Sequence, residues 1–275
     1  MSDSPATLDI ADRIAWLRFA RPDKRNCMNP ALNRRMGELL DEVEFREDVG
    51  VLVLTGEGSA WSAGMDLKEY FRETEAKGLG ATRAAQREAY GWWRRLRWFQ
   101  KPTIAMVNGW CFGGGYGPLY ACDLAIAADE AQFALSEINW GILPGGGATK
   151  VVVDLMPMRD AMYHAMTGEL IGGKQAAAWR LVNESVPLAE LEARVTQLAK
   201  VLLAKNPVAL KATKDAVRRV KEMTYDAAED YLVRAQEAAN SHDNSGRKEG
   251  IRQFIDEKSY KPGLAVYDKD RATPA

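Results

Sequence analysis

The sequence predicts an α/β fold that ends in a helical region. In the first half, short β-branched and apolar runs alternate with helical patterns, whereas from Lys174 onward the patterns are helical apart from one short stretch near Leu181. Strands that alternate with helices in this rhythm pair in parallel through crossover helices. We therefore expect a core over residues 1–203 and a helical carboxyl-terminal region over residues 204–275.

The individual elements follow from local signals. The predicted strands are brief apolar segments bounded by turn residues, at 14–19, 51–55, 103–107 and 124–128. A helix begins at Asn29-Pro30 and runs to about Val43, because Asn is favoured as N-cap and Pro in the first turn. Asn206-Pro207 repeats this start. Helical patterns predict further helices at 82–100, 116–121, 187–204, 207–222, 225–241 and 244–257.

Composition and charge narrow the classes of protein. The 275 residues are 47% hydrophobic and 27% charged, with a net charge of -1, so nothing in the overall charge attracts a polyanion such as nucleic acid. No apolar stretch approaches the roughly 18 residues of a membrane span. The first residues lack the basic and then apolar layout of a signal peptide. Three cysteines without metal-type spacing are expected to be reduced thiols, which favours a cytoplasmic location.

Histidine is nearly absent. His164 and His242 are the only two, and neither has a neighbouring His, Cys or carboxylate at a metal-ligand spacing. A histidine-based triad or a two-histidine zinc site is therefore not expected, and we predict no metal. The chemistry must come from carboxylates, tyrosines and backbone amides.

The predicted helix over residues 82–100 can be interpreted in two ways. It carries Arg83, Arg87, Arg94, Arg95 and Arg97 beside Trp92, Trp93 and Trp98. Basic residues interleaved with aromatic ones can contact nucleic acid. An amphipathic helix with tryptophans in the core and arginines in water is the simpler interpretation, and we favour it.

Three segments carry candidate chemistry. Asn108 to Gly115 ends in three glycines between a strand and a helix, where close backbone approach and unpaired amides suit a developing oxyanion. The segment from Ala60 to Leu67 also follows a strand, so we expect the Met65 amide to be a second donor beside that of Gly114. The alternative is an ordinary strand-to-helix loop in which Asp66 caps the helix. Glu137 stands among apolar neighbours, where burial raises a carboxyl pKa and suits proton transfer, although a surface glutamate would fit the same pattern.

Taken together, these segments and the run from Arg21 to Asn26 resemble the crotonase (enoyl-CoA hydratase/isomerase) superfamily over essentially the whole chain. The resemblance implies a spiral of ββα units with a helical trimerisation region, in a homotrimer or a dimer of trimers. It implies an acyl-CoA substrate, no cofactor besides its coenzyme A, and an oxyanion hole formed by the amides of Met65 and Gly114. The implied contacts to substrate and coenzyme A are Lys24, Ala63, Asp66, Leu67, Ser136, Trp140, Gly117 and Tyr231.

A narrower resemblance connects the chain to the hydroxycinnamoyl-CoA (feruloyl-CoA) hydratase-lyases. The runs that carry it are 66–71, 108–112, 135–141 and 258–264. It implies hydration of feruloyl-, coumaroyl- or caffeoyl-CoA and retro-aldol cleavage to an aldehyde of the vanillin type and acetyl-CoA. Glu137 is then the acid and base, and Tyr70 binds the phenol of the substrate; without the resemblance, a tyrosine packed on a helix is the alternative for Tyr70.

Two positions depart from these relatives. Simple hydratases of the superfamily carry a second glutamate, and the lyases a serine, where this chain has Gly117. The lyases also carry a second phenol-binding tyrosine where this chain has Val233, with Tyr231 nearby. Hydration or isomerisation of an aliphatic enoyl-CoA therefore stays an alternative. An RNA-binding protein of the same fold is the alternative from another class, and only the arginine-rich helix favours it.

Overall fold

The computed structural model describes residues 4–261 and 265–272. The chain forms two compact units, Met1–Gln197 and Leu198–Ala275, and each is described by itself. This division falls inside helix α8 (Leu188–Leu203), six residues before the expected boundary after residue 203, which stays a prediction. Of the run 258–264, residues 262–264 lie outside the described part.

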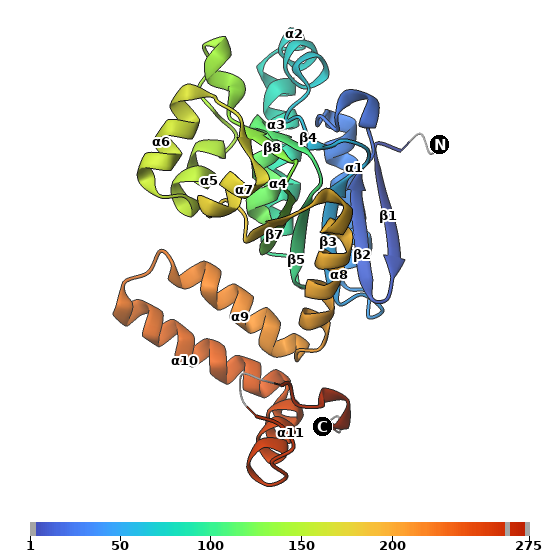
Figure 1. Ribbon diagram of the computed structural model, residues 1–275, viewed down its shortest axis with the longest axis vertical. Helices are drawn as coiled ribbons and strands as arrows, with labels where there is room; N and C mark the ends of the chain where they lie inside the picture. Colours follow the sequence, from blue (N-terminus) through green and yellow to red (C-terminus); the bar gives the residue numbers. More distant parts are fainter. Residues whose placement is uncertain (1–3, 262–264, 273–275) are drawn as a thin grey trace. The chain divides into compact units, whose positions relative to one another are not determined.

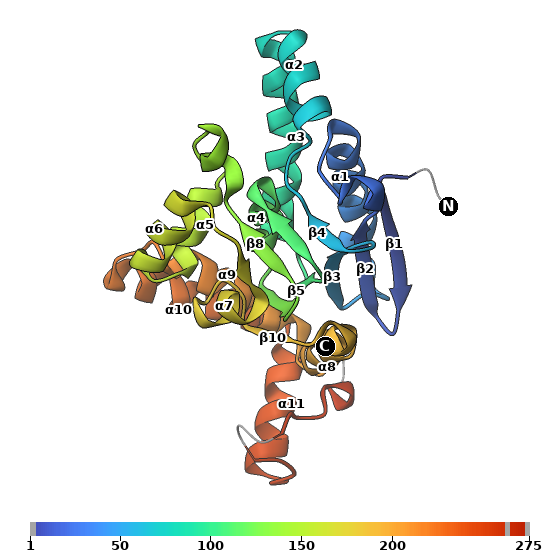
Figure 2. The same cartoon turned by 45° about the horizontal axis from the view of Figure 1, so that its top comes forward.

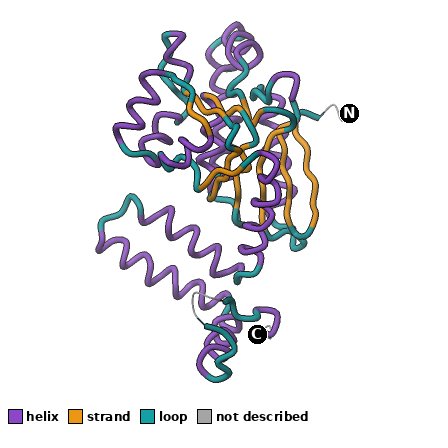
Figure 3. The backbone as a smooth tube through the Cα atoms, viewed as in Figure 1, coloured by secondary structure: helices purple, strands orange, loops and turns teal. Residues whose placement is uncertain are grey.

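The first unit contains two β-sheets (Figures 1 and 3). The six-stranded sheet has the order β1-β2-β3-β5-β7-β10, and the four-stranded sheet has the order β4-β6-β8-β9. Their bounds are β1 Ala6–Ala11, β2 Ile14–Phe19, β3 Val51–Gly56, β4 Ala60–Ser62, β5 Thr103–Val107, β6 Trp110–Phe112, β7 Leu124–Ala128, β8 Gln132–Ala134, β9 Ile171–Gly172 and β10 Glu184–Val186.

The predicted parallel pairing is confirmed for the centre of the large sheet. β2, β3, β5, β7 and β10 pair in parallel, whereas β1 pairs antiparallel with β2. All six residues of β3 are buried, which explains its continuous apolar sequence. The sequence did not predict β1, whose exposed and half-buried residues alternate at the sheet edge.

From β3 to β8, consecutive strands go alternately to the two sheets. β3, β5 and β7 lie in the large sheet, and β4, β6 and β8, which follow them directly, lie in the small one. A helix follows each of these pairs, so the chain repeats a ββα unit. The spiral expected from the family resemblance is therefore confirmed, and it places the loops after β4, β6 and β8 next to one another.

The helices of the first unit include those that the sequence predicted. Helix α1 contacts α3, and Figure 2 shows the two running side by side. The helix expected from residue 82 begins earlier, at Leu79, because Gly78 takes a positive φ of 92° as its N-cap. The bounds are α1 Pro30–Glu44, a π-helix Leu67–Arg72, α2 Glu73–Ala76, α3 Leu79–Arg97, α4 Tyr116–Ala121, α5 Ala148–Leu155, α6 Met158–Thr167 and α7 Gly173–Ala178.

Helix α3 follows the amphipathic interpretation. Trp92 and Trp93 are buried, and Trp98 is half-buried, whereas Arg83, Arg87 and Arg94 are exposed. Arg95 pairs with Glu44 at 2.8 Å and also with Asp41. This pattern is that of a helix packed by its aromatic face.

The second unit is helical in its described part. It contains α9 (Pro207–Val220), α10 (Tyr225–His242) and α11 (Asn244–Ile255), in good agreement with the predicted helices. Neither α9 nor α10 has a buried residue. No helix of the described residues is long and apolar enough to cross a membrane.

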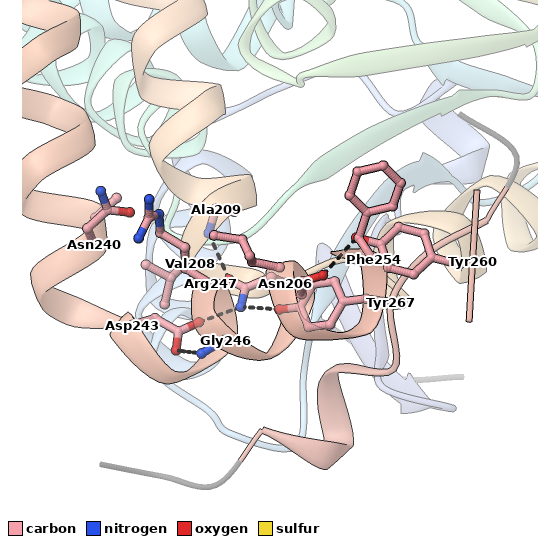
Figure 4. Close-up of a pocket in the computed structure, with 13 residues that line it drawn as sticks. Asn206, Val208, Ala209, Asn240, Asp243, Gly246, Arg247, Phe254, Tyr260 and Tyr267 are labelled. Carbon is pink, nitrogen blue, oxygen red and sulfur yellow. Dashed lines mark hydrogen bonds between the residues drawn. The ribbon is translucent and has the colours of Figure 1, made fainter. Parts of the chain in front are cut away.

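A cavity of about 360 Å³ lies within the second unit (Figure 4). Its polar groups bind one another: the Asn206 amide donates to the Tyr267 hydroxyl at 3.0 Å and to Asp243, and Asp243 accepts from the Gly246 amide at 2.7 Å. Asn206 and Asp243 also cap α9 and α11. The polar groups of this cavity therefore hold helix ends together, and nothing in it indicates chemistry.

Candidate active site

A cavity of about 680 Å³ in the first unit gathers most of the predicted site residues. Its walls come from the loops after β4, β6 and β8 and from the segment before α1. The predicted residues that line it are Lys24, Ala63, Met65, Asp66, Leu67, Gly114, Ser136, Glu137 and Trp140. Lys24 and Trp140, 116 residues apart in sequence, thus meet at one place because the ββα repeat brings their loops together.

The orientation of the Met65 amide follows from the backbone around it. Met28 donates its amide to the Gly64 carbonyl at 2.7 Å, and the Asp66 amide donates to the Met28 carbonyl at 2.9 Å. Met65 lies between these bonds in a parallel bridge with Met28. Its own N–H group therefore faces away from Met28, because amides alternate in direction along an extended chain.

The glycine segment approaches Met65 closely. A Cβ atom on Gly64 would lie 3.1 Å from the Gly114 nitrogen, and one on Gly114 would lie 3.2 Å from the Met65 nitrogen. The φ of Gly64 is +90°, a conformation that favours glycine. Gly114 belongs to the first turn of the short helix that continues into α4, where amides lack intrahelical acceptors. Two amide groups, from Met65 and Gly114, thus lie beside one another at the cavity.

Glu137 stands opposite the same segment. A Cβ atom on Gly113 would lie 2.5 Å from Glu137 Oε1, so the carboxylate rests directly against a backbone that has no side chain there. Glu137 Oε2 is buried and has no hydrogen-bond partner among the described residues. Burial raises the pKa of the Glu137 carboxyl, as predicted from its apolar neighbours.

The other two carboxylates of the cavity differ from Glu137. Asp66 caps the π-helix by accepting from the amides of Lys68 and Glu69 at 3.0 and 2.9 Å. Its second oxygen accepts from Arg21 at 3.2 Å and from the Cys27 thiol at 3.2 Å. Glu75 is exposed at the cavity wall. Both carboxylate oxygens of Asp66 therefore accept two hydrogen bonds each, and the prediction that Asp66 caps a helix is confirmed.

Arg21 ties this cap to the rest of the site. It also donates to the Cys27 carbonyl at 2.7 Å and to Glu69 at 2.7 Å. Burial and the hydrogen bond to Asp66 raise the pKa of Cys27 to about 12, so its thiol stays protonated. The network fixes the segment on which the Met65 amide lies.

Three predicted residues do not line the cavity. Tyr70 is buried in the π-helix behind Phe71, with ring centroids 5.0 Å apart, and burial and nearby Tyr90 raise its pKa to about 12. Gly117 faces the ring of Trp93. Tyr231 lies on α10 in the second unit, and its role stays a prediction.

The structure adds residues that the sequence did not single out. Phe71, Phe112, Trp110 and Ile142 line the cavity, and the Arg25 guanidinium lies over the Trp110 ring at 4.0 Å from its centroid. Short strands such as β6 give no clear alternation, so their facing residues had no signal in the sequence. Among the described residues, no group of three or more His, Cys, Asp or Glu could hold a metal ion.

A buried tyrosine–histidine pair lies at the start of helix α4, directly after the glycine segment. Tyr116, the first residue of α4, shares a hydrogen bond of 2.7 Å with Nε2 of His164 on α6. Both side chains are fully buried, and burial lowers the pKa of His164 to about 4. A neutral histidine therefore anchors the start of α4.

Comparisons with known proteins agree with this geometry. Residues 9–262 match the enoyl-CoA hydratase/isomerase family. A hydroxycinnamoyl-CoA hydratase-lyase of Pseudomonas fluorescens is 52% identical over 264 residues, covering 95% of this chain and 96% of that protein. A 2,3-dehydroadipyl-CoA hydratase of Escherichia coli (strain K12) is 32% identical, covering 90% and 94%. The crystal structure of an enoyl-CoA hydratase from Bacillus anthracis superposes with a TM-score of 0.84 at 26% identity, covering 96% and 99% of the two chains.

Proposed function

The chain belongs to the enoyl-CoA hydratase/isomerase family, and on that premise we propose that it is a hydratase-lyase of 4-hydroxycinnamoyl-CoA thioesters. Its substrates are feruloyl-, coumaroyl- and caffeoyl-CoA, and its products are an aromatic aldehyde of the vanillin type and acetyl-CoA. The observation that carries the proposal is the position of the Glu137 carboxylate against Gly113, beside the amides of Met65 and Gly114, with its buried Oε2 unpartnered among the described residues. The likeness to the Pseudomonas fluorescens enzyme supports the substrate class.

Met65 and Gly114 form the oxyanion hole in this proposal. Both amides donate to the thioester carbonyl oxygen, which becomes negative when an enolate forms. Donors that are already in place stabilise this charge without reorganisation, an effect worth about 10²- to 10³-fold in rate for one donor. The close approach of the two backbones supports this role.

Glu137 moves the protons of the hydration step. Its carboxylate takes a proton from water as the water oxygen bonds to the β-carbon, and the double-bond electrons pass into the enolate. The protonated Glu137 then gives this proton to the α-carbon, which yields the β-hydroxy thioester. The raised pKa supports both halves of the step, because a carboxyl group titrating nearer to neutrality both accepts and releases a proton readily.

The same group performs the cleavage. Glu137 takes the proton of the β-hydroxyl group, the bond between the α- and β-carbons breaks, and its electrons form the acetyl-CoA enolate in the oxyanion hole. The aldehyde leaves, and Glu137 returns the proton to the α-carbon. Each step conserves atoms and electrons and needs no reagent besides water, so the coenzyme A carried by the substrate is the only cofactor that this scheme requires.

Tyr70 acts on the para-hydroxyl group of the substrate ring. Electron flow from that oxygen gives a quinone-methide-like form, which opens the β-carbon to water without a second carboxylate at position 117. Since its pKa is raised to about 12, Tyr70 keeps its proton near neutral pH and donates it in a hydrogen bond. Tyr231 is a further contact to the acyl group in this proposal.

The coenzyme A portion lies along the outer cavity wall. Lys24 is exposed there and provides a positive charge for the phosphate groups, with the backbone of Ala63 and Leu67 beside it. Ser136 and Trp140 complete the contacts. Asp66 contributes indirectly, because its carboxylate holds the helix end and Arg21.

The second unit is the trimerisation region in this proposal, which gives a homotrimer or a dimer of trimers. Large apolar side chains on its helices support this assignment, since they are exposed in the single chain: Val217, Tyr225, Leu232, Val233, Ile251, Phe254 and Ile255. The enzyme works in the cytoplasm and binds neither nucleic acid nor membrane. Cys27, Cys111 and Cys122 are present as thiols, which supports a reducing compartment.

Product analysis tests the function directly. Feruloyl-, coumaroyl- and crotonyl-CoA are incubated with the enzyme under identical conditions, and products are separated by liquid chromatography. We expect vanillin or 4-hydroxybenzaldehyde together with an equal amount of acetyl-CoA from the two aromatic thioesters. Rapid hydration of crotonyl-CoA with no aldehyde from either aromatic substrate would instead favour the aliphatic hydratase.

A further inference from the structure

Trp93 reaches from α3 to the glycine helix α4. Its indole is buried, with 7% of its surface exposed. A Cβ atom on Gly117 would lie 2.6 Å from Cε3, 2.7 Å from Cζ3 and 2.8 Å from Cδ2 of this ring, all shorter than real contacts. Because an indole is rigid, Trp93 fills the volume that any side chain at position 117 would need.

Two further aromatic side chains lie near this contact. The Tyr90 ring centroid is 5.3 Å from that of Trp93, and a Cβ atom on Gly146 would meet both the Trp93 ring and the Tyr90 hydroxyl at 3.9 Å. Tyr70 is close enough to Tyr90 for the latter to influence its pKa. Two aromatic rings of α3 thus face two glycines, Gly117 and Gly146, an arrangement that suits a flat apolar group.

The Trp93 N–H group is buried and has no hydrogen-bond acceptor among the described residues. Trp92, the next residue and equally buried, instead donates to Asn33 Oδ1 at 3.0 Å. A buried donor without an acceptor is costly and uncommon in native proteins, and it calls for an explanation such as a bound ligand. The bond to Asn33 satisfies the N–H group of Trp92, whereas packing alone leaves that of Trp93 without an acceptor among the described residues.

The position of Trp93 relative to the carboxylate fits the length of an aromatic acyl group. Glu137 rests on Gly113, and Trp93 rests on Gly117, four residues further along the same segment. Because this segment combines a 3-10 turn with the start of α4, four residues span roughly 6 to 8 Å. In a cinnamoyl thioester the aryl ring is attached directly to the β-carbon, so the ring extends over a similar length beyond the carbons on which Glu137 acts.

We propose that Trp93 is a specificity-determining residue at the acyl end of the site. Its indole occupies the place of a side chain at position 117 and forms a wall for an aromatic acyl group, and its N–H group donates a hydrogen bond to an oxygen on that ring. The inference rests on the proposed function, and it adds a residue that recognises the aryl group. It also explains how position 117 is filled when glycine stands there.

Binding of unreactive substrate analogues tests this role separately from catalysis. The saturated thioesters 3-(4-hydroxyphenyl)propionyl-CoA, 3-phenylpropionyl-CoA and butyryl-CoA cannot be hydrated, and their dissociation constants are measured by isothermal titration calorimetry. The proteins are the unmodified enzyme, Trp93→Phe and the matched control Trp92→Phe, each checked for folding by thermal melting. In the Trp93→Phe variant we expect about 10-fold weaker binding of the hydroxylated analogue, the usual effect of losing one buried hydrogen bond to a ligand.

The affinities for the three analogues distinguish a role of Trp93 in substrate recognition from a purely structural role. For Trp93→Phe we expect the affinity for butyryl-CoA to change less than about 3-fold, within the size of a small packing adjustment. Trp92→Phe should shift all three affinities equally or not at all, whatever it does to the melting temperature. Equal weakening of all three ligands by Trp93→Phe, or unchanged binding of the hydroxylated analogue, would overturn the proposal. If the unmodified enzyme forms no aldehyde, the proposed function fails, but these affinities still report on Trp93.

Discussion

Gly113 and Gly117 lie four residues apart, on either side of the junction between a 3-10 turn and α4, and the groups that face them are opposite in character. Beside Gly113 stands a carboxylate at the end of a flexible side chain, whereas beside Gly117 stands a rigid indole. The first glycine takes a positive φ of 46°, and Gly117 belongs to a regular helix. The same residue type therefore makes room for proton transfer at one position and for packing at the other.

This difference separates the residues that carry out the proposed reaction from those that we expect to select the substrate. The half around Gly113 contains the acid and base of the proposed reaction and the two amide donors. The half around Gly117 contains aromatic rings, one of which has an unpaired donor. Substitutions in the first half should lower turnover of every substrate, whereas substitutions in the second should alter stability and the choice of substrate.

The largest effect is expected from Glu137→Gln, which keeps the shape of the side chain and removes its ability to exchange a proton. We expect kcat to fall by about 10²- to 10⁴-fold for aromatic and aliphatic thioesters alike, the usual contribution of a general acid or base. Affinity for coenzyme A should stay within about 3-fold of that of the unmodified enzyme, because the predicted coenzyme A contacts lie elsewhere on the wall. Steady-state kinetics and titration calorimetry measure the two. Near-normal turnover would remove Glu137 from the mechanism.

The next largest effect compares Gly113→Ala with Gly117→Ala. An alanine methyl at position 113 would displace the carboxylate at the end of the Glu137 side chain, so kcat should fall about 100-fold, as a displacement of about 1 Å in a catalytic group can cause. The left-handed φ adds a destabilisation of about 1–2 kcal/mol. At position 117 the methyl group meets a ring that cannot yield, and overpacking costs about 1–3 kcal/mol.

The two variants are distinguished by measuring melting temperature and kcat for both. Gly113→Ala should lose more activity than stability, and Gly117→Ala should lose more stability than activity. Replacing Trp93 by Leu in the Gly117→Ala protein should restore part of the lost stability, because it removes the ring that the methyl group strikes. If the variants lose activity and stability in equal proportion, the division of the site into these halves is wrong.

The sequence predicted one half of the site better than the other. The glycine triplet and a glutamate among apolar residues are local signals, so Gly114 and Glu137 were singled out as candidates without a structure, and both line the cavity. Trp93 was not singled out, because a tryptophan on an amphipathic helix looks like any core residue. Only the fold brings position 93 next to position 117, and no local pattern records that contact.

The same limit applies to the fold. Helices with Asn-Pro starts and strands buried on both faces were predicted closely, since each signal lies within a few residues. β6 and β8 have three residues each, too few for a period-two pattern to be recognised. The small sheet that positions the loops of the site therefore became visible only in the structure.

The smallest expected effect is on the pH dependence of kcat/KM. Glu137 must be ionised to take a proton from water, so activity should fall as the pH drops through its pKa. Because burial raises that pKa, the fall should begin at higher pH than for an ordinary glutamate of pKa about 4.3.

His164 acts on stability instead: its folded-state pKa of about 4 lies below the unfolded value, so stability is lost as the pH falls from about 6.5 toward 4. Initial rates and tryptophan fluorescence, recorded on the same samples, separate the two. We expect activity to decline while the fluorescence still reports a folded protein, and a simultaneous decline would assign the acid limb to unfolding.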